Sequence, residues 1–384
     1  MQFIPLKCAW LKEKLPLNVY SDETSKLFDS ALRQLISWFE CEQIGGLLGT
    51  IEKMNKSEPD FLLGKTLKLG LDTLSSGRSK RSDPTFEQEL TDLVKDANLR
   101  GNERERKHAY AVQLFADSEM HRACNEWEDI LVEYPNDLMA LKFAHTGYFY
   151  IGEHLAMRDS IARVIDKWDK ERYPGYSYLH GMYAYGLEES GEYIEAEKQA
   201  KMGLQLQRQD CWSTHAIAHC MEMASDFNNG INFLESTEND WSQCKLLHGH
   251  NYWHNALFYI EKGDFEAALT IYDKDKQNIG ENAIIMRDFG EKLCSLINLF
   301  NKEKYDQAFD DLYSIKSQFS RLSGSHAQKD IFTQFLVCAG LHSQDKERNK
   351  KALNVLQERG AKMKDSALAL RLVKRYEEGL FSER

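Results

Sequence analysis

The fold is decided by residues 260–272, which read Ile260-Glu261-Lys262-Gly263-Asp264-Phe265-Glu266-Ala267-Ala268-Leu269-Thr270-Ile271-Tyr272. Gly263 suits a tight turn between two helices, because glycine adopts positive φ without a Cβ clash. Ala268 is small enough for the second helix to press against the first. We expect Phe265 to plug the turn and Tyr272 to fill the next hole on the same helix face. The stretch therefore predicts an antiparallel helix pair.

The same arrangement recurs along the chain, at residues 188–197, 302–309 and, more weakly, 118–123. When the packing alanine is aligned at one position of a unit of about 34 residues, repeats begin near six residues: Arg104, Leu138, Ser177, Cys211, Gly249 and Phe289. These starts are 34, 39, 34, 38 and 40 residues apart, which is one unit or one unit with a short insertion. The recurrence predicts an all-α fold, a right-handed superhelix of stacked helix-turn-helix repeats.

Helices are also expected on both sides of these repeats. Upstream, residues 21–40 and 45–57 read as a helical hairpin, and Asp83-Pro84-Thr85 caps a helix running to about residue 98. Downstream, helices are expected over residues 327–343, 346–360 and 365–380, the last as a polar-faced cap. We therefore predict an N-terminal helical region with a divergent repeat, residues 1–100, and a repeat solenoid with C-terminal capping helices, residues 101–384.

Composition narrows the classes of partner. The 384 residues are 42 % hydrophobic and 28 % charged, which is typical of a folded chain with a large core. The net charge of −11 repels a phosphate backbone, so no nucleic-acid partner is predicted. No run of about 18 apolar residues predicts a membrane span, and no secretion signal opens the chain. The eight cysteines form no C-x-x-C pair and read as reduced thiols, so we expect a cytoplasmic protein.

Two histidine pairs are the strongest candidates for chemistry. His215 and His219 are four residues apart, as are His250 and His254, and this spacing places both rings of a pair on one helix face. The pairs are one repeat apart, so their helices should be stacked neighbours. Glu222 lies one turn beyond His219. A transition-metal site is therefore a candidate, with His215, His219, Glu222, His250 and His254 as ligands.

The sequence favours a less specific interpretation of these histidines. Histidines in a repeat groove commonly hydrogen-bond one another, hydroxyl groups or a bound carboxylate without a metal. Zinc peptidases place a glutamate directly after the first histidine, but here Ala216 and Asn251 occupy those positions. The chain also lacks the G-x-x-x-x-G-K-[ST], G-x-G-x-x-G and G-x-S-x-G motifs. No catalytic residue is predicted.

Four segments carry a resemblance to a known family. They are residues 141–145 (LKFAH), 212–219 (WSTHAIAH), 250–254 (HNYWH) and 324–332 (GSHAQKDIF). With the Gly/Tyr/Ala pattern, they are similar to the tetratricopeptide repeat protein 38 family over nearly the whole chain. The resemblance implies a tetratricopeptide-type solenoid, and it implies no established activity.

Groove-facing positions of the first helices predict a binding surface with apolar walls and scattered polar groups. The predicted lining comprises His108, Lys142, His145, Phe149, Tyr178, Tyr185, His215, His219, Glu222, His250, Trp253 and His254. The sequence favours a non-catalytic scaffold that binds a peptide segment, another protein or a small ligand there, and an oligomer in which a neighbour fills the groove stays open. The alternative is a metal-dependent enzyme or metal-binding protein. Apart from that metal, no cofactor is predicted.

Overall fold

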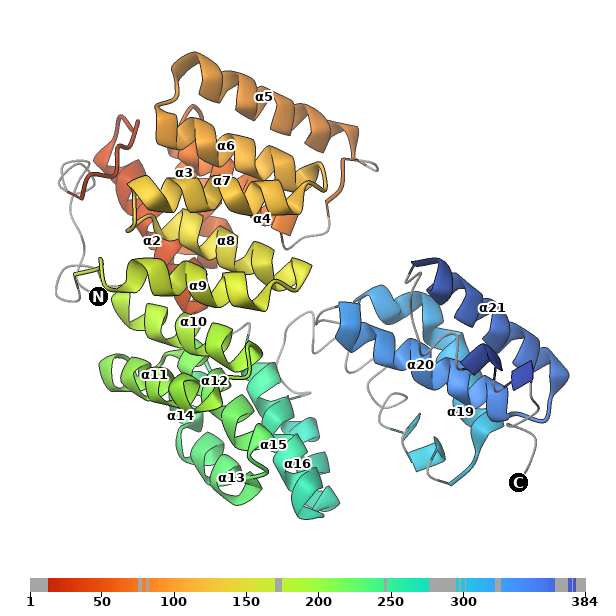
Figure 1. Ribbon diagram of the computed structural model, residues 1–384. Coiled ribbons are helices and arrows are strands. Elements are labelled where there is room, and N and C mark those ends of the chain that lie inside the picture. The colour runs from red at the N-terminus through yellow and green to blue at the C-terminus, as the bar shows by residue number, and fades with distance from the viewer. Residues whose placement is uncertain are drawn as a thin grey trace. The chain divides into compact units, whose positions relative to one another are not determined.

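The computed structural model describes residues 13–74, 78–80, 83–169, 175–244, 247–275, 295–296, 298–300, 302–321, 326–362, 372–374 and 376–377. The chain divides into two compact units, residues 1–271 and 272–384, which are described separately. Within the described residues every regular element is a helix (Figure 1). None of these helices has the length and apolar character needed to cross a bilayer. The predicted division at residue 100 stays a prediction.

The first unit opens with a helical region, in which the elements are α2 (Asp22–Ser37), η1 (Glu42–Ile44), α3 (Gly46–Ser57), α4 (Leu62–Leu74) and α5 (Pro84–Arg100). The side chain of Ser21 accepts the Thr24 amide and caps α2. Asp83 caps α5 in the same way, with Pro84 in its first turn. The three helices predicted here are confirmed. The sequence did not predict α4.

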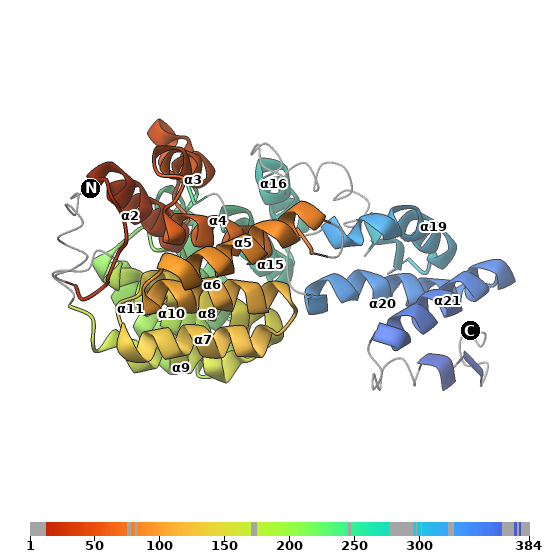
Figure 2. The same ribbon diagram turned by 90° about the horizontal axis from the view of Figure 1, so that it is seen from above.

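Five helix pairs follow, and each begins where a repeat was predicted. The pairs are α6/α7 (Glu103–Ala116, Met120–Glu133), α8/α9 (Leu138–Ile151, His154–Ile165), α10/α11 (Tyr176–Glu189, Tyr193–Leu206), α12/α13 (Cys211–Met223, Phe227–Ser236) and α15/α16 (His248–Lys262, Phe265–Asp275), with the short α14 (Glu238–Trp241) before the last. Figures 1 and 2 show these helices stacked side by side in chain order. The all-α architecture of stacked helix-turn-helix pairs is confirmed. The sixth predicted start, Phe289, lies outside the described residues.

Small residues allow the pairs to nest. The packing alanines Ala123 and Ala196 are fully buried, and Gly263 ends α15 with φ at +84°. Gly230 takes the small-residue position in α13, where a Cβ would lie 2.5 Å from a ring carbon of Phe258. A larger side chain there would push α15 away from α13.

Phe265 corrects one expectation. Its side chain is 64 % exposed and does not plug the turn after Gly263. Phe265 is the first residue of α16, the last helix to begin in the first unit, and no described side chain of that unit covers its outer face. Tyr272, expected to fill a hole on the same helix, has no described side chain.

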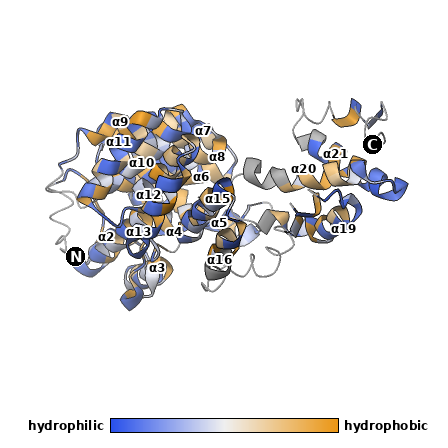
Figure 3. Ribbon diagram, turned by 90° about the horizontal axis from the view of Figure 1, so that it is seen from below, coloured by the Kyte–Doolittle hydropathy of each residue, from blue (hydrophilic) through white to orange (hydrophobic). Residues whose placement is uncertain are grey.

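Apolar side chains form one core through most of the first unit, centred on large residues such as Phe28, Phe61, Trp127 and Phe143. Figure 3 shows hydrophobic and hydrophilic residues sharing the same helices, as expected of helices with one buried face. Further clusters continue the core toward α15. The core therefore holds α10, α12 and α15 in fixed register.

The second unit has its own core. It contains α19 (Tyr305–Ile315), η3 (Lys316–Arg321), α20 (His326–His342) and α21 (Lys346–Lys362). Buried residues of these helices, among them Phe309, Leu336 and Leu356, pack together. The predicted helices at 327–343 and 346–360 are confirmed. Most of the predicted cap, residues 365–380, lies outside the described residues.

Candidate metal centre

The candidate centre is built by α12 and α15, first helices of neighbouring repeats. Asp210 begins α12 by accepting the Trp212 amide at 3.1 Å. Gly181 of α10 lies against this end, where a Cβ would come 2.6 Å from the Cβ of Trp212. The cap and the close approach fix the rotation of α12. His215 and His219 thereby face α15, where His250 and His254 meet them.

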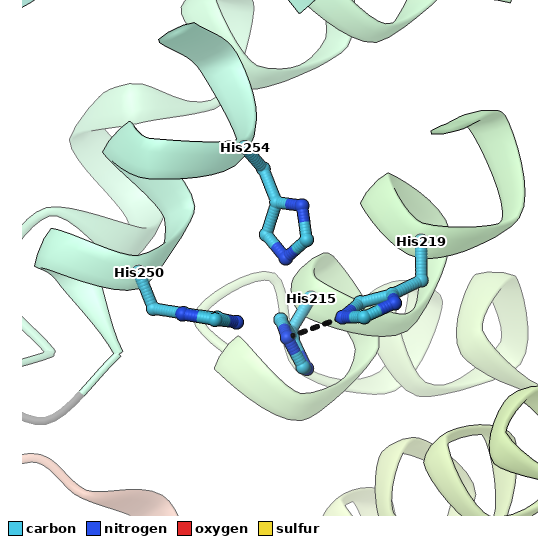
Figure 4. Close-up of side chains that lie close together, drawn as sticks. All are labelled: His215, His219, His250 and His254. Carbon is cyan, nitrogen blue, oxygen red and sulfur yellow. Dashed lines mark hydrogen bonds between the residues drawn. The ribbon is translucent and has the colours of Figure 1, made fainter. Parts of the chain in front are cut away.

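Figure 4 shows the four imidazole rings pointing toward one another from the two helices. One ligand nitrogen from each ring lies within 4.8 Å of the other three. The shortest approach is 2.9 Å, between the Nε2 atoms of His215 and His219. Ring centroids of His250 and His254 lie 4.7 and 5.2 Å from that of His215. In the part of the chain that the structure describes, no other cluster of His, Cys, Asp and Glu offers this arrangement.

Two carboxylates hold the outer nitrogens of these rings. Glu188 of α10 lies 2.8 Å from Nδ1 of His219, and Glu222 lies 2.9 Å from Nδ1 of His254. A carboxylate at Nδ1 keeps the proton there and leaves the Nε2 lone pair facing the cluster. Glu222, a candidate ligand by sequence, therefore lies behind a histidine.

Sequence reasoning missed Glu188. It occupies the twelfth position of the repeat that begins near Ser177, which is also the position of Glu222 in its own repeat. That shared position is the signal that would have found it. Equivalent positions of neighbouring repeats lie side by side. A carboxylate at this position can therefore contact a histidine of the next repeat.

Burial keeps most of this cluster uncharged. It lowers the pKa of His250 to about 3, with the neighbouring histidines lowering it further. The pKa values of His215 and His254 are lowered well below their usual range, again by burial first and then by neighbouring histidines. Burial also lowers the pKa of His219, but the hydrogen bond and charge of Glu188 outweigh it and raise the value overall. Neutral imidazole is the form that binds metal.

The Nε2 atom of His254 is buried and has no hydrogen-bond partner among the described residues. His254 is 0 % exposed, so water does not reach the ring freely. A buried polar atom without a partner costs about 1–3 kcal/mol, so it calls for an explanation. Converging lone pairs on neutral imidazoles are a donor set suited to zinc, copper, nickel, cobalt or iron.

The remaining groove candidates divide into those that adjoin the centre and those that do not. Tyr185 adjoins it, with its ring centroid 5.4 Å from that of His215. Tyr185 also contacts His145 at 6.0 Å and Phe149 at 6.2 Å. Trp253, 48 % exposed, stacks on His250 at 5.2 Å. Of these side chains only Trp253 is well exposed, whereas Tyr185 and His145 are buried, at 8 % and 1 % exposure, so the predicted groove position of His145 is wrong.

Lys142 and Tyr178 lie further from the centre. The Lys142 ammonium lies over the rings of Trp38 and Trp212, at 5.1 and 4.7 Å, and donates to the hydroxyl of Thr146. Tyr178 is partly buried against the core. Lys142 is therefore buried, at 5 % exposure, and Tyr178 lies partly buried at the edge of the core.

His108 is not brought to the cluster at all. Its ring is fully buried and its Nε2 lies 2.9 Å from Asp137, which also pairs with Arg104 at 2.5 Å. A ring held inside the core cannot line an open groove. The repeat pattern gave His108 a groove position, but it does not distinguish a groove-facing side chain from one buried by the N-terminal helices.

No protein-family model matches the chain. Similar solved structures include a Rap protein complexed with competence and sporulation factor, at 12 % identity, 95 % of this chain, 100 % of that chain and a TM-score of 0.47. The apo form of RapI matches at 11 % identity, 88 % of this chain, 98 % of that chain and a TM-score of 0.48. A tetratricopeptide repeat protein from Parabacteroides merdae matches at 10 % identity, 82 % and 98 % coverage and a TM-score of 0.42. At these values the matches assign no activity and no partner to this chain, whose own helix pairs define a tetratricopeptide-like repeat.

Proposed function

We propose that the protein binds a first-row transition-metal ion through His215, His219, His250 and His254. The observation that carries the proposal is the convergence of four ligand nitrogens within 4.8 Å in a largely buried place. A hydrogen-bonded histidine network, the interpretation that the sequence favours, would pair these nitrogens, and the Nε2 atoms of His215 and His219 do form such a hydrogen bond, at 2.9 Å. The partnerless Nε2 of His254 argues for an ion instead.

The surroundings of the four rings support the same proposal. In metal sites, a ligating histidine commonly donates its other N–H to a carboxylate, which orients the ring and raises its basicity. Glu188 and Glu222 occupy those places behind His219 and His254. Because the ligands come from two stacked repeats, folding itself assembles the site.

Elemental analysis of protein purified without a histidine tag tests this proposal. We expect about one equivalent of zinc, iron, cobalt, nickel or copper per chain, lost in the double variant His250→Ala/His254→Ala. His121→Ala is the matched control, because that side chain is 70 % exposed on α7 and lies outside the cluster. Chelation should lower the melting temperature of the wild type and the control but not that of the double variant. Metal-free protein that takes up no added ion in equilibrium dialysis would contradict the proposal.

A second proposal concerns the predicted role as a scaffold. Partly exposed aromatic side chains, Phe149 and Tyr150 of α8 and Trp253 of α15, are favourable contacts for a peptide or protein partner. Affinity capture with the wild type beside a Phe149→Ala/Trp253→Ala variant tests it, and a partner retained equally by both would contradict it. Membership of the tetratricopeptide repeat protein 38 family and a cytoplasmic location belong to this proposal too, supported by the resembling segments and by six described cysteines that are free thiols.

A further inference from the structure

The four histidines are not buried equally, and one side of the cluster is more exposed than the other. His215 and His254 are 5 % and 0 % exposed, whereas His219 and His250 are only partly buried. The side chain of Glu222, behind His254, is 34 % exposed. The nitrogen cluster is therefore closed where α12 packs on α15 and more open beside His219 and His250.

Four nitrogens complete the shell of a tetrahedral ion and leave further positions on an ion with five or six donors. All four nitrogens come from two neighbouring helices, two from each helix, at residues one turn apart. Among the described residues no fifth His, Cys, Asp or Glu joins the set. Several first-row ions take five or six donors. The further positions would face the open side.

The charge at the centre favours an anion in such a position. Imidazole ligands are neutral, so a divalent ion there keeps its full charge. The nearest carboxylates, Glu188 and Glu222, already accept from histidine Nδ1 atoms, at 2.8 and 2.9 Å. A partly buried cation with neutral ligands attracts a negatively charged donor strongly, because the surrounding protein screens it poorly.

An apolar surface lies at the same open side. The Trp253 ring stacks on the His250 ring with 21° between their planes, and its centroid lies 4.9 Å from that of His254. Trp253 is 48 % exposed, so much of the indole is free for a further contact. A ligand held on the ion would extend across this surface.

We propose that the metal ion keeps a coordination position open to the groove, and that a small carboxylate with an apolar body binds there. The carboxylate ligates the ion and the body packs on Trp253. This inference rests on the proposed metal binding and names the ligand class of the same site. It follows from the four-nitrogen set, the uneven burial and the exposed indole together.

Cobalt(II) reports on both parts of this inference. The protein is freed of metal with a chelator and loaded with Co²⁺, whose visible absorption bands report on coordination. It is then titrated with acetate and with benzoate. We expect both anions to change the bands, and benzoate to bind about tenfold tighter than acetate, the effect of one added aromatic contact. In Trp253→Ala the preference for benzoate should disappear, and Trp253→Phe should keep part of it.

Tyr110→Ala is the control, because Tyr110 is an aromatic residue of α6 with 37 % exposure that belongs to neither proposed site. It should keep the full preference for benzoate. Cobalt bands that neither anion changes would overturn the inference while leaving metal binding intact. A benzoate preference that survives in Trp253→Ala would overturn the placement of the apolar body. The absence of cobalt bands from the wild type would overturn metal binding itself, and this inference with it.

Discussion

Two regions of the first unit bury histidines in opposite ways. His108 in α6 contacts Asp137, whose carboxylate also pairs with Arg104, so the buried charges compensate one another. The four histidines of α12 and α15 meet mainly other histidines. The first region resembles the buried ion pairs that hold a core together. The second brings four donor nitrogens together, an arrangement that suits a bound cation.

The pKa values express the same contrast. Burial raises the pKa of Asp137, but the charges of Arg104 and His108 outweigh it and the value lies far below its ordinary range. The carboxylate is therefore a permanent charge within the core. Burial lowers the pKa of His108 as it does that of His250, so both rings are neutral and the contrast lies in the charged pair beside His108. A buried histidine thus indicates a metal site only where ring nitrogens of several histidines converge, since Nδ1 of His108 also lacks a partner among the described residues.

The largest effect should come from breaking the compensated region. Asp137→Ala removes the partner of Arg104 and His108 and also the cap of α8, since Asp137 accepts the Ala140 amide. We expect a loss of about 3–5 kcal/mol in the free energy of unfolding, because a buried charge is left without its partner. Urea denaturation of metal-free protein measures it. His250→Ala should cost far less under the same conditions, and equal losses would remove the contrast between the regions.

An intermediate effect is expected from the two carboxylates that contact the proposed metal ligands. Glu222→Gln and Glu188→Gln should each lower metal affinity about 10- to 100-fold, the usual effect of removing a carboxylate that orients a ligating histidine. Competition against a chelator of known affinity measures it. Glu153→Gln, which changes an exposed carboxylate beside His121, should leave the affinity unchanged. Wild-type affinity in both centre variants would show that the carboxylates do not orient the ligands.

The smallest effect concerns Lys142, a buried cation with no described carboxylate partner. Burial lowers its pKa to about 7 in the folded chain, below an unfolded value of about 10.4. Stability from this group is therefore full above the unfolded pKa and is lost as pH falls through the folded one. Lys142→Met lacks this dependence, so its stability relative to the wild type should rise by about 1 kcal/mol or more between pH 9 and pH 6. Urea denaturation across this range, beside the exposed-site control Lys198→Met, measures it, and a difference independent of pH would contradict it.

Most of the fold was predictable because small residues recur at fixed intervals. Ala123 and Ala196 mark where second helices press on first ones, and both are fully buried. The periodicity of the histidine pairs likewise placed His215 and His250 on neighbouring helices. In contrast, α4 carries no repeat signature, only an apolar composition compatible with several structures. The local sequence pattern was enough to predict the stacked helix pairs, but it did not predict α4, which packs against them.

The parts of the site that the sequence did not predict depend on three-dimensional surroundings. Whether His108 faces a groove or a core depends on the N-terminal helices packed over α6, which no repeat pattern encodes. The role of Glu188 depends on α10 lying beside α12 at a particular height. Phe265 is exposed, and no helix that begins after α16 belongs to its own unit. Burial by a later element is not a local property of the sequence.

The two histidine pairs belong to neighbouring repeats, so an ion bound at the centre would also connect those repeats. In a repeat array each helix pair contacts only its neighbours, so the terminal pair unfolds locally most readily. The α15/α16 pair is the last helix pair to begin in the first unit. An ion bound by His215 and His219 of α12 and by His250 and His254 of α15 would cross-link the last repeat to the one before it. With the ion bound, the last helix pair would unfold only together with the pair before it. Without the ion, it would unfold alone.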